Sequence, residues 1–263
     1  MFKKLRSLIG RLFTENQQML IIMRLSGIFW FFRKYFLSVI IDYPNDFRNN
    51  WRAIKNFSSH DKERNFTVYQ LIKIHNEIFK NKKTNIIEFG VDRGGTLTTI
   101  CKFIKSNSEI LALDSFGAYA NNIKENVTKH DTHYQGRYVP FTKKTRFKNF
   151  DYLDLQKSLD EIIIKKNCKL NIIKCHFPDI IENKHLDLIK SKKFSFVHLD
   201  FDLYAPTADA IKLIMPRLEK SAILLIDDYN FLNQEGVKWA INESEINLNN
   251  CIQTQSGQLV CFT

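Results

Sequence analysis

The sequence predicts an α/β protein in which a mostly parallel, doubly wound β-sheet carries helices on both faces. From about Phe66 onward, segments with apolar residues at helical spacing alternate with short apolar segments. The short segments are continuous apolar runs, which is typical of strands that are buried on both faces. Several of these runs end in acidic residues, and in a parallel sheet the carboxyl ends of the strands form the edge where ligands bind.

The predicted elements follow one another in a regular order. Helices are predicted where apolar residues recur three or four positions apart, at 66–81, 96–107, 153–167, 181–192, 207–220 and 235–244. Strands are predicted at 84–90, 109–116, 170–177, 194–204 and 222–229, followed by two short strands at 250–255 and 258–263.

One segment between these elements, 117–149, is too long for a passive connection between a strand and a helix. We expect it to form a lid over the substrate. Its cations, among them Arg137 and Arg146, could then meet a diphosphate if the substrate is carried on a nucleotide. An exposed surface loop is the alternative.

The first 60 residues differ from the rest, so we expect an N-terminal helical extension at 1–60 and one domain at 61–263. The start, "MFKKLRSLIGRLF", is basic and amphipathic, and Arg24, Arg33 and Lys34 interrupt the apolar run behind it. A membrane-spanning helix needs about 20 nearly uncharged residues, so we do not expect one. We expect helices that pack on the domain or on another subunit of a homo-oligomer; a peripheral membrane contact is the alternative.

Charge and cysteine content narrow the class of protein. The chain of 263 residues has a formal net charge of +11, but its lysines and arginines are spread along the sequence. No nucleic-acid-binding motif accompanies the charge, so we expect no nucleic-acid partner. The five cysteines are odd in number and contain no C-x-x-C pair, which indicates reduced thiols and a cytoplasmic location, with contact at the inner face of the membrane as an option.

Four carboxylates follow the two most hydrophobic strands. Asp200 and Asp202 lie near the end of "FSFVHLDFDLY", and Asp227 and Asp228 lie near the end of "AILLIDDY". Carboxylates that cluster without a cation repel one another. Oxygen ligands of this kind suit hard divalent cations such as Mg²⁺, so this edge of the sheet is a candidate metal site.

A glycine-rich turn follows the first strand. "NIIEFGVDRGGTLTTI" lacks the G-x-G-x-x-G pattern of dinucleotide-binding proteins, but it places Gly90 and Gly94 after a strand-end acid, Glu88. Asp114 ends the next strand and is placed to accept hydrogen bonds from ribose hydroxyls. A turn of this type with a second acid is how class I methyltransferases hold S-adenosylmethionine; a purely structural turn is the alternative.

The ordered set of motifs resembles a known family. "EFGVDRGGT", "LDSF", "IIKCHFPDII" and "FVHLDFDLYAPTADAIKLIMPRLEKSAILLIDDY" occur in the order found in the macrocin O-methyltransferases, bacterial enzymes that methylate sugar hydroxyls. The resemblance covers roughly residues 67–263. It implies a class I methyltransferase (Rossmann-like) fold, S-adenosylmethionine as methyl donor and a divalent metal, usually Mg²⁺. One departure is Asp92, which stands where many class I methyltransferases have glycine.

The resemblance also implies roles for particular residues. Glu88, Gly90, Gly94 and Asp114 would bind S-adenosylmethionine, and Asp200, Asp227 and Asp228 would bind the metal. Asp200 or Asp202 would be the catalytic base that takes the proton of the hydroxyl; Asp202 could instead cap the helix that follows. We therefore expect an O-methyltransferase acting on a sugar or nucleotide-linked sugar for surface polysaccharide synthesis.

Two other functions fit parts of the pattern. A metal-dependent glycosyltransferase also uses a D-x-D motif to hold the metal of a nucleotide-sugar, but the glycine-rich turn would then have no function. An inactive methyltransferase-like module that binds a membrane surface through its N-terminus is the other alternative, and the intact set of acids argues against it.

Overall fold

The computed structural model describes residues 42–58, 62–116, 127–131, 150–178, 181–230 and 235–263. The chain divides into two compact units, 1–45 and 46–263, and the second unit contains the β-sheet. The extension before residue 42 lies outside the described residues, as do 117–126 and 132–149 of the predicted lid. In the described part of the chain, no helix is both long enough and apolar enough to cross a membrane.

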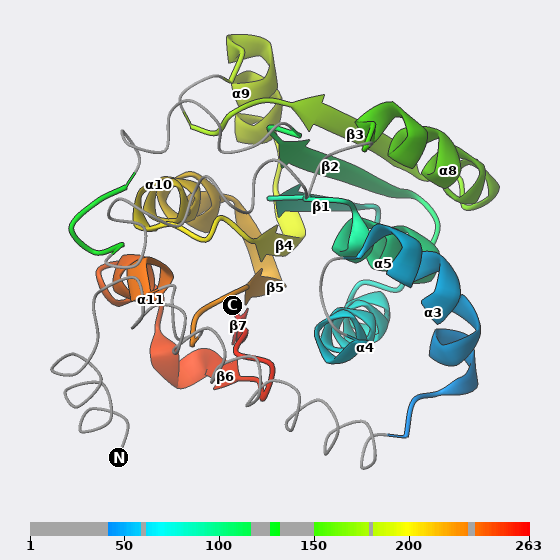
Figure 1. Ribbon diagram of the computed structural model, residues 1–263, viewed down its shortest axis with the longest axis horizontal. Coiled ribbons are helices and arrows are strands. Elements are labelled where there is room, and N and C mark those ends of the chain that lie inside the picture. The colour runs from blue at the N-terminus through cyan, green and yellow to red at the C-terminus, as the bar shows by residue number, and fades with distance from the viewer. Residues whose placement is uncertain (1–41, 59–61, 117–126, 132–149, 179–180, 231–234) are drawn as a thin grey trace, which may run out of the picture. The chain divides into compact units, whose positions relative to one another are not determined.

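A seven-stranded sheet forms the centre of the second unit (Figure 1), in the order β3-β2-β1-β4-β5-β7-β6. Five strands are mutually parallel: β1 (Thr84–Phe89), β2 (Ser108–Asp114), β3 (Lys169–Lys174), β4 (Phe194–Leu199) and β5 (Leu218–Ile226). β7 (Leu259–Phe262) runs antiparallel to β5 and to β6 (Cys251–Gln253). The mostly parallel sheet confirms the predicted fold class.

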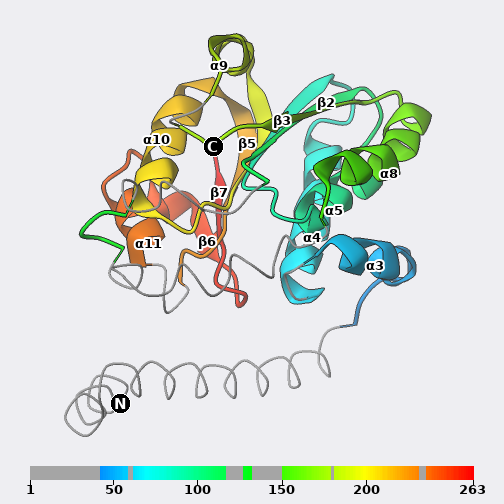
Figure 2. The ribbon, with the colours of Figure 1, turned by 45° about the horizontal axis from the view of Figure 1, so that its top comes forward.

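Helices cover both faces of the sheet, as Figures 1 and 2 show. One face carries α3 (Asn45–Phe57), α4 (Lys62–Ile78), α5 (Gly95–Phe103) and α8 (Tyr152–Lys165). The other carries α9 (Asn183–Lys190), α10 (Tyr204–Ile214) and α11 (Glu235–Asn242). Two short 3₁₀ helices, Met215–Arg217 and Leu248–Asn250, precede β5 and β6.

Each strand contributes to two cores, because successive side chains point to opposite faces. Ile86 and Phe196 belong to the core under α4, α5 and α8, whereas Ile87 and Val197 belong to the core under α9, α10 and α11. Burial on both faces explains why these strands read as continuous apolar runs in the sequence.

Two elements differ from the prediction in ways that matter for the site. α4 begins at Lys62, one turn before the predicted start, and β4 ends at Leu199 instead of continuing to Tyr204. Asp202 adopts a left-handed conformation with φ 63°, which an extended strand cannot contain. α10 then begins at Tyr204, and Pro206 in its first turn is compatible with a helix.

α3 lies within the predicted extension 1–60 and packs closely on the following helix. The Phe47 side chain is completely buried, with its ring centroid 5.2 Å from those of Phe66 and Tyr69. The Tyr69 hydroxyl donates a hydrogen bond to Asp46 Oδ1 (2.8 Å). The domain boundary near residue 60 stays a prediction.

Candidate active site

The predicted acids lie at the carboxyl edge of the two central strands. Asp200 directly follows β4, and its backbone N–H donates to Phe89 O of β1 (2.9 Å). Asp227 directly follows β5, and its N–H donates to Leu199 O of β4 (2.8 Å). The parallel ladder therefore extends one residue past each strand and places Asp200 between the turn after β1 and Asp227.

The glycine-rich turn packs directly on this acid. Gly90 has φ 81°, and a Cβ atom added to it would lie 1.9 Å from the carbonyl oxygen of Asp200. A side chain at this position would be strained by the backbone conformation and would also collide with backbone. Gly94 also has a positive φ, 92°, and an added Cβ would lie 2.5 Å from Leu155 Cδ2 of α8. Gly90 is thus required by the backbone of Asp200, and Gly94 is favoured by its own positive φ, since the end of the Leu155 side chain can move.

Asp114 joins the same turn to the end of β2. Its Oδ2 accepts a hydrogen bond from the Asp92 N–H (2.7 Å), and its Oδ1 accepts one from the Phe116 N–H (2.7 Å). Asp92 has φ 50°, a left-handed conformation that aspartate tolerates better than most residues, so it can stand where glycine is common. Burial raises the pKa of Asp114, although these two backbone donors oppose the shift.

Glu88 is completely buried and bonded inside the protein. Glu88 and His198 are paired across β1 and β4, and His198 Nδ1 lies 3.1 Å from Glu88 Oε1. On its other side, His198 Nε2 lies 3.9 Å from Asp227 Oδ2. Burial lowers the pKa of His198, but the carboxylates of Asp227 and Glu88 outweigh burial and raise that pKa to about 10. His198 therefore lies between Glu88 of β1 and Asp227, the residue after β5.

Sequence reasoning missed Arg64, which reaches the acids from α4. Arg64 Nη1 lies 3.0 Å from Asp227 Oδ1, and Nη2 lies 2.8 Å from Asp228 Oδ1. Arg64 stands four and eight residues before Val68 and Ile72, two residues of the buried core. A charged residue in register with the apolar stripe of a helix was the available signal.

The described residues contain two groups of side chains that could hold a metal ion. Ligand atoms of His198, Asp200 and Asp227 lie within 4.8 Å of one another, and so do those of Asp200, Asp202 and Asp228. Asp200 belongs to both groups, whereas Asp227 and Asp228, the other two predicted ligands, belong to different groups. Burial, and after it the charges of Asp227 and Asp228, raise the pKa of Asp200 well above its ordinary value. A set of carboxylate oxygens with this mutual repulsion fits a hard divalent cation.

Five residues of the predicted lid, 127–131, are described, and they pack on α10 and α11. Asp131 Oδ1 accepts a hydrogen bond from the Tyr204 N–H (2.8 Å) at the start of α10. Its Oδ2 accepts from the Thr128 N–H (2.8 Å). The His130 ring lies 4.6 Å from the ring of Tyr204 and 5.2 Å from that of Trp239. The named lid cations Arg137 and Arg146 lie outside the described residues.

A match to a sequence family agrees with this arrangement. The profile of the Macrocin-O-methyltransferase (TylF) family matches residues 66–254, which include the glycine-rich turn and all four acids after β4 and β5. The chain belongs to the macrocin O-methyltransferase family. The predicted resemblance is confirmed, and so is the enzyme class, an S-adenosylmethionine-dependent O-methyltransferase.

Solved structures share the fold of this macrocin O-methyltransferase family member. The calicheamicin methyltransferase CalS11 matches with a TM-score of 0.56 at 17% identity, over 84% of this chain and 94% of CalS11. The O-methyltransferase NovP matches with a TM-score of 0.53 at 14% identity, over 78% of this chain and 81% of NovP. A search of characterised sequences gave no significant match. At these identities the structural matches show the fold alone.

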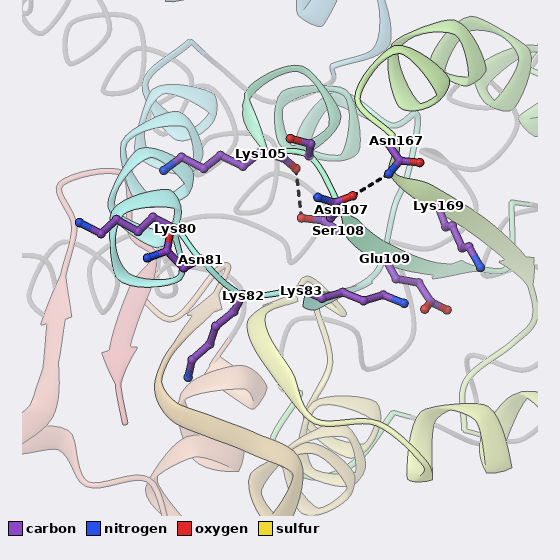
Figure 3. Close-up of a pocket in the computed structure, with 11 residues that line it drawn as sticks. Lys80, Asn81, Lys82, Lys83, Lys105, Asn107, Ser108, Glu109, Asn167 and Lys169 are labelled. Atoms are coloured by element: carbon purple, nitrogen blue, oxygen red, sulfur yellow. Dashed lines mark hydrogen bonds between the residues drawn. The ribbon is translucent and has the colours of Figure 1, made fainter.

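A cavity of about 520 Å³ lies at the opposite edge of the sheet of this methyltransferase (Figure 3), where β1, β2 and β3 begin. Lysines surround it, namely Lys80, Lys82, Lys83, Lys105 and Lys169. The C-terminal ends of α4 and α5 also lie here, and Lys105 Nζ donates to Asn76 O of α4 (2.6 Å). A lysine near a helix C-terminus stabilises unpaired carbonyl groups, which accounts for Lys105 without a substrate.

Proposed function

We propose that this enzyme methylates a hydroxyl of a sugar, carried on a nucleotide or within a glycan, and that it needs a divalent cation, most simply Mg²⁺. The observation that carries the proposal is the convergence of acids directly beside the glycine turn at Gly90. Ligand atoms of Asp200, Asp202 and Asp228 lie within 4.8 Å of one another, and Asp200 forms a second such group with Asp227 and His198. The family name supports a sugar acceptor, since the motifs of this chain are those of enzymes that methylate sugar hydroxyls.

The donor side of the proposed site is the turn after β1. Gly90 and Gly94 let the backbone approach S-adenosylmethionine closely, and Asp114 would accept hydrogen bonds from its ribose hydroxyls. Glu88 would support the turn from below, because its hydrogen bond with His198 holds its side chain inside the protein. The contact between Gly90 and the Asp200 carbonyl fixes the distance between the donor turn and the acids.

The acceptor side is the cluster of acids. We propose that Asp200, Asp227 and Asp228 hold the cation, as the resemblance to the family implies. A divalent cation there would stabilise the negative charge that develops on the attacked hydroxyl oxygen. Asp200 and Asp202 are the candidates for the base that takes the hydroxyl proton, and their carboxylates lie within 4.8 Å of each other. Asp202 leaves the strand direction with φ 63°, so it reaches this position from the loop before α10.

The proposal also covers the location of the enzyme in the cell, its pathway and its oligomeric state. We propose a cytoplasmic enzyme of surface polysaccharide synthesis that forms a homo-oligomer; a peripheral membrane contact through the N-terminal extension 1–60 is the alternative use of that segment. The cysteines support a reducing compartment, because all five, Cys101, Cys168, Cys175, Cys251 and Cys261, are free thiols. The family match favours methyl transfer over the glycosyltransferase alternative, because it gives the glycine-rich turn a function.

A mass-spectrometric assay tests the proposed function. The enzyme is incubated with S-adenosylmethionine, Mg²⁺ and a panel of nucleotide-sugars, with and without excess EDTA. We expect one sugar to gain one methyl group, and EDTA to abolish the gain. The substitution Asp200→Asn removes both a ligand and a candidate base, so it should lower the rate at least about 100-fold.

Asp187→Asn is the matched control, because Asp187 is an exposed aspartate on α9 and does not belong to the acid cluster. Its rate should equal that of the unmodified enzyme. Methyl transfer that is indifferent to EDTA would remove the metal from the proposal. Transfer to RNA or to a phenol, with none to any sugar, would replace the substrate class, and binding of lipid without any transfer would favour the inactive module.

A further inference from the structure

We propose that Arg64 is the positioning residue of the acid cluster: its guanidinium ties Asp227 to Asp228 and supplies their counter-charge before a divalent cation binds. The inference deepens the proposed function and rests on it for the purpose of the two acids. Its basis is a fork in which two different nitrogens of Arg64 contact two different carboxylates, at 3.0 and 2.8 Å.

Burial makes the loss of one partner of these contacts costly. The side chain of Arg64 is 10% exposed, that of Asp227 1% and that of Asp228 6%. Ion pairs on a protein surface contribute little because water and salt screen them. A buried pair is different, since removing one partner leaves the other charged and without compensation in a medium of low polarity.

The fork also bears on the conformation of the acids. Asp228 has φ 59°, which costs energy in a residue other than glycine. Its N–H donates to Asp227 Oδ1 (3.0 Å), the same oxygen that Arg64 contacts. The guanidinium therefore supports a strained turn whose effect is to place two carboxylates side by side.

Arg64 is compatible with metal binding by the same acids. It contacts Oδ1 of each carboxylate, and a carboxylate has two oxygens. A planar guanidinium can contact two carboxylates at once, whereas the single ammonium group of lysine cannot reproduce the fork. Arg64 and Asp228 are 164 residues apart along the chain. α4 holds Arg64 in place because its residues Val68 and Ile72 are packed in the core.

A double-mutant cycle in excess EDTA tests the inference without any metal. Thermal unfolding is measured for the unmodified protein, Arg64→Met, Asp228→Asn and the double variant. Arg64→Met should lower Tm by about 10 °C, because it leaves buried acids uncompensated. The double variant should lose clearly less than the sum of the single losses, because it removes both partners.

Addition of Mn²⁺ gives a second readout, which a purely structural arginine would not change. We expect saturating Mn²⁺ to raise Tm more in Arg64→Met than in the unmodified protein, because the ion then takes over the counter-charge that Arg64 supplies to the two acids. Arg217→Met is the matched control: Arg217 is half-buried and donates to Leu213 O (2.6 Å), away from the acids. It should show the same Mn²⁺ increment as the unmodified protein. If Arg64→Met does not fold, Arg64→Lys takes its place in both experiments.

Additive losses in EDTA would overturn the inference, and so would Mn²⁺ increments that are clearly positive but equal in Arg64→Met and Arg217→Met. Coupling in EDTA together with no response to Mn²⁺ in any protein would support Arg64 as the counter-charge while removing the metal from the proposed function. The two proposals can therefore fail separately.

Discussion

Gly90 is the residue that connects the donor side of the site to the acceptor side. Its backbone lies against the carbonyl of Asp200, and its φ of 81° is in the left-handed region. Its identity could be predicted from the sequence as part of the turn after a strand. Its contact with Asp200 could not, because 110 positions separate the two and only the pairing of β1 with β4 brings them together.

The substitution Gly90→Ala should therefore damage both stability and donor binding. We expect a loss of about 3 kcal/mol in the free energy of unfolding, from backbone strain and from the collision with Asp200. The affinity for S-adenosylhomocysteine should fall at least about tenfold, because the turn must move away from β4. Urea denaturation and calorimetric titration measure the two effects.

Gly257→Ala separates strain from collision. Gly257 has a similar φ of 87°, but the nearest atom to an added Cβ is 3.8 Å away. It should cost about 1 kcal/mol and leave binding of S-adenosylhomocysteine unchanged. Equal effects of the two substitutions would show that the contact with Asp200 has no part in donor binding.

At the scale of elements, α4 shows which features the sequence could predict and which it could not. Its apolar spacing predicted a helix, but the predicted start at Phe66 omitted the turn that carries Arg64. That turn, "KERN", is polar, and periodicity cannot assign polar residues to a helix. The end of β4 was misplaced for a related reason: "DFDLY" continues the apolar alternation, while Asp202 turns the backbone out of the strand.

α4 is also fixed to the sheet at its other end by a buried histidine. His75 Nε2 lies 2.8 Å from Ser195 Oγ of β4, and the His75 side chain is 1% exposed. Burial lowers the pKa of His75 from 6.5 to about 4, with the charge of Lys105 acting in the same direction. The folded protein therefore keeps this imidazole neutral in a range of pH where the unfolded chain protonates it.

This difference predicts that the folded protein loses stability in acid. Between pH 6.5 and pH 4 the unfolded state takes up a proton at His75 and the folded state does not, so stability falls as the pH falls. Over this range of pH, His75 lowers the free energy of unfolding by about 3 kcal/mol. His75→Gln, which can retain a bond to Ser195 but does not titrate, should show a correspondingly smaller loss over this range.

The measurement is urea denaturation of both proteins at several pH values. Other groups titrate in the same range, so the difference between the two proteins is the quantity that reports His75. Parallel curves for the unmodified protein and His75→Gln would contradict the assignment of a neutral buried histidine.

At the scale of the whole molecule, the sequence predicted the fold class and the edge of the sheet where the acids lie. It could do so because continuous apolar runs identify strands buried on both faces, and because parallel strands place the residues that follow them on one edge. It could not predict that the side chains of Glu88, His198, Asp227 and Arg64 lie next to one another. They come from β1, from β4, from the residue after β5 and from α4.

The arrangement of the whole molecule gives the acids their position beside the donor turn. The chain order reverses between β1 and β4, and the turn after β1 meets Asp200 after β4 at this point of the sheet. Ligands of doubly wound proteins bind at such points. One cation held by Asp200, Asp227 and Asp228 next to S-adenosylmethionine is the central claim.

Anomalous X-ray diffraction from crystals grown with Mn²⁺ and S-adenosylhomocysteine tests this claim most directly. We predict one strong anomalous peak in contact with the carboxylates of Asp200, Asp227 and Asp228, with S-adenosylhomocysteine against the turn at Gly90. A peak elsewhere, or no peak beside a bound S-adenosylhomocysteine, would contradict it.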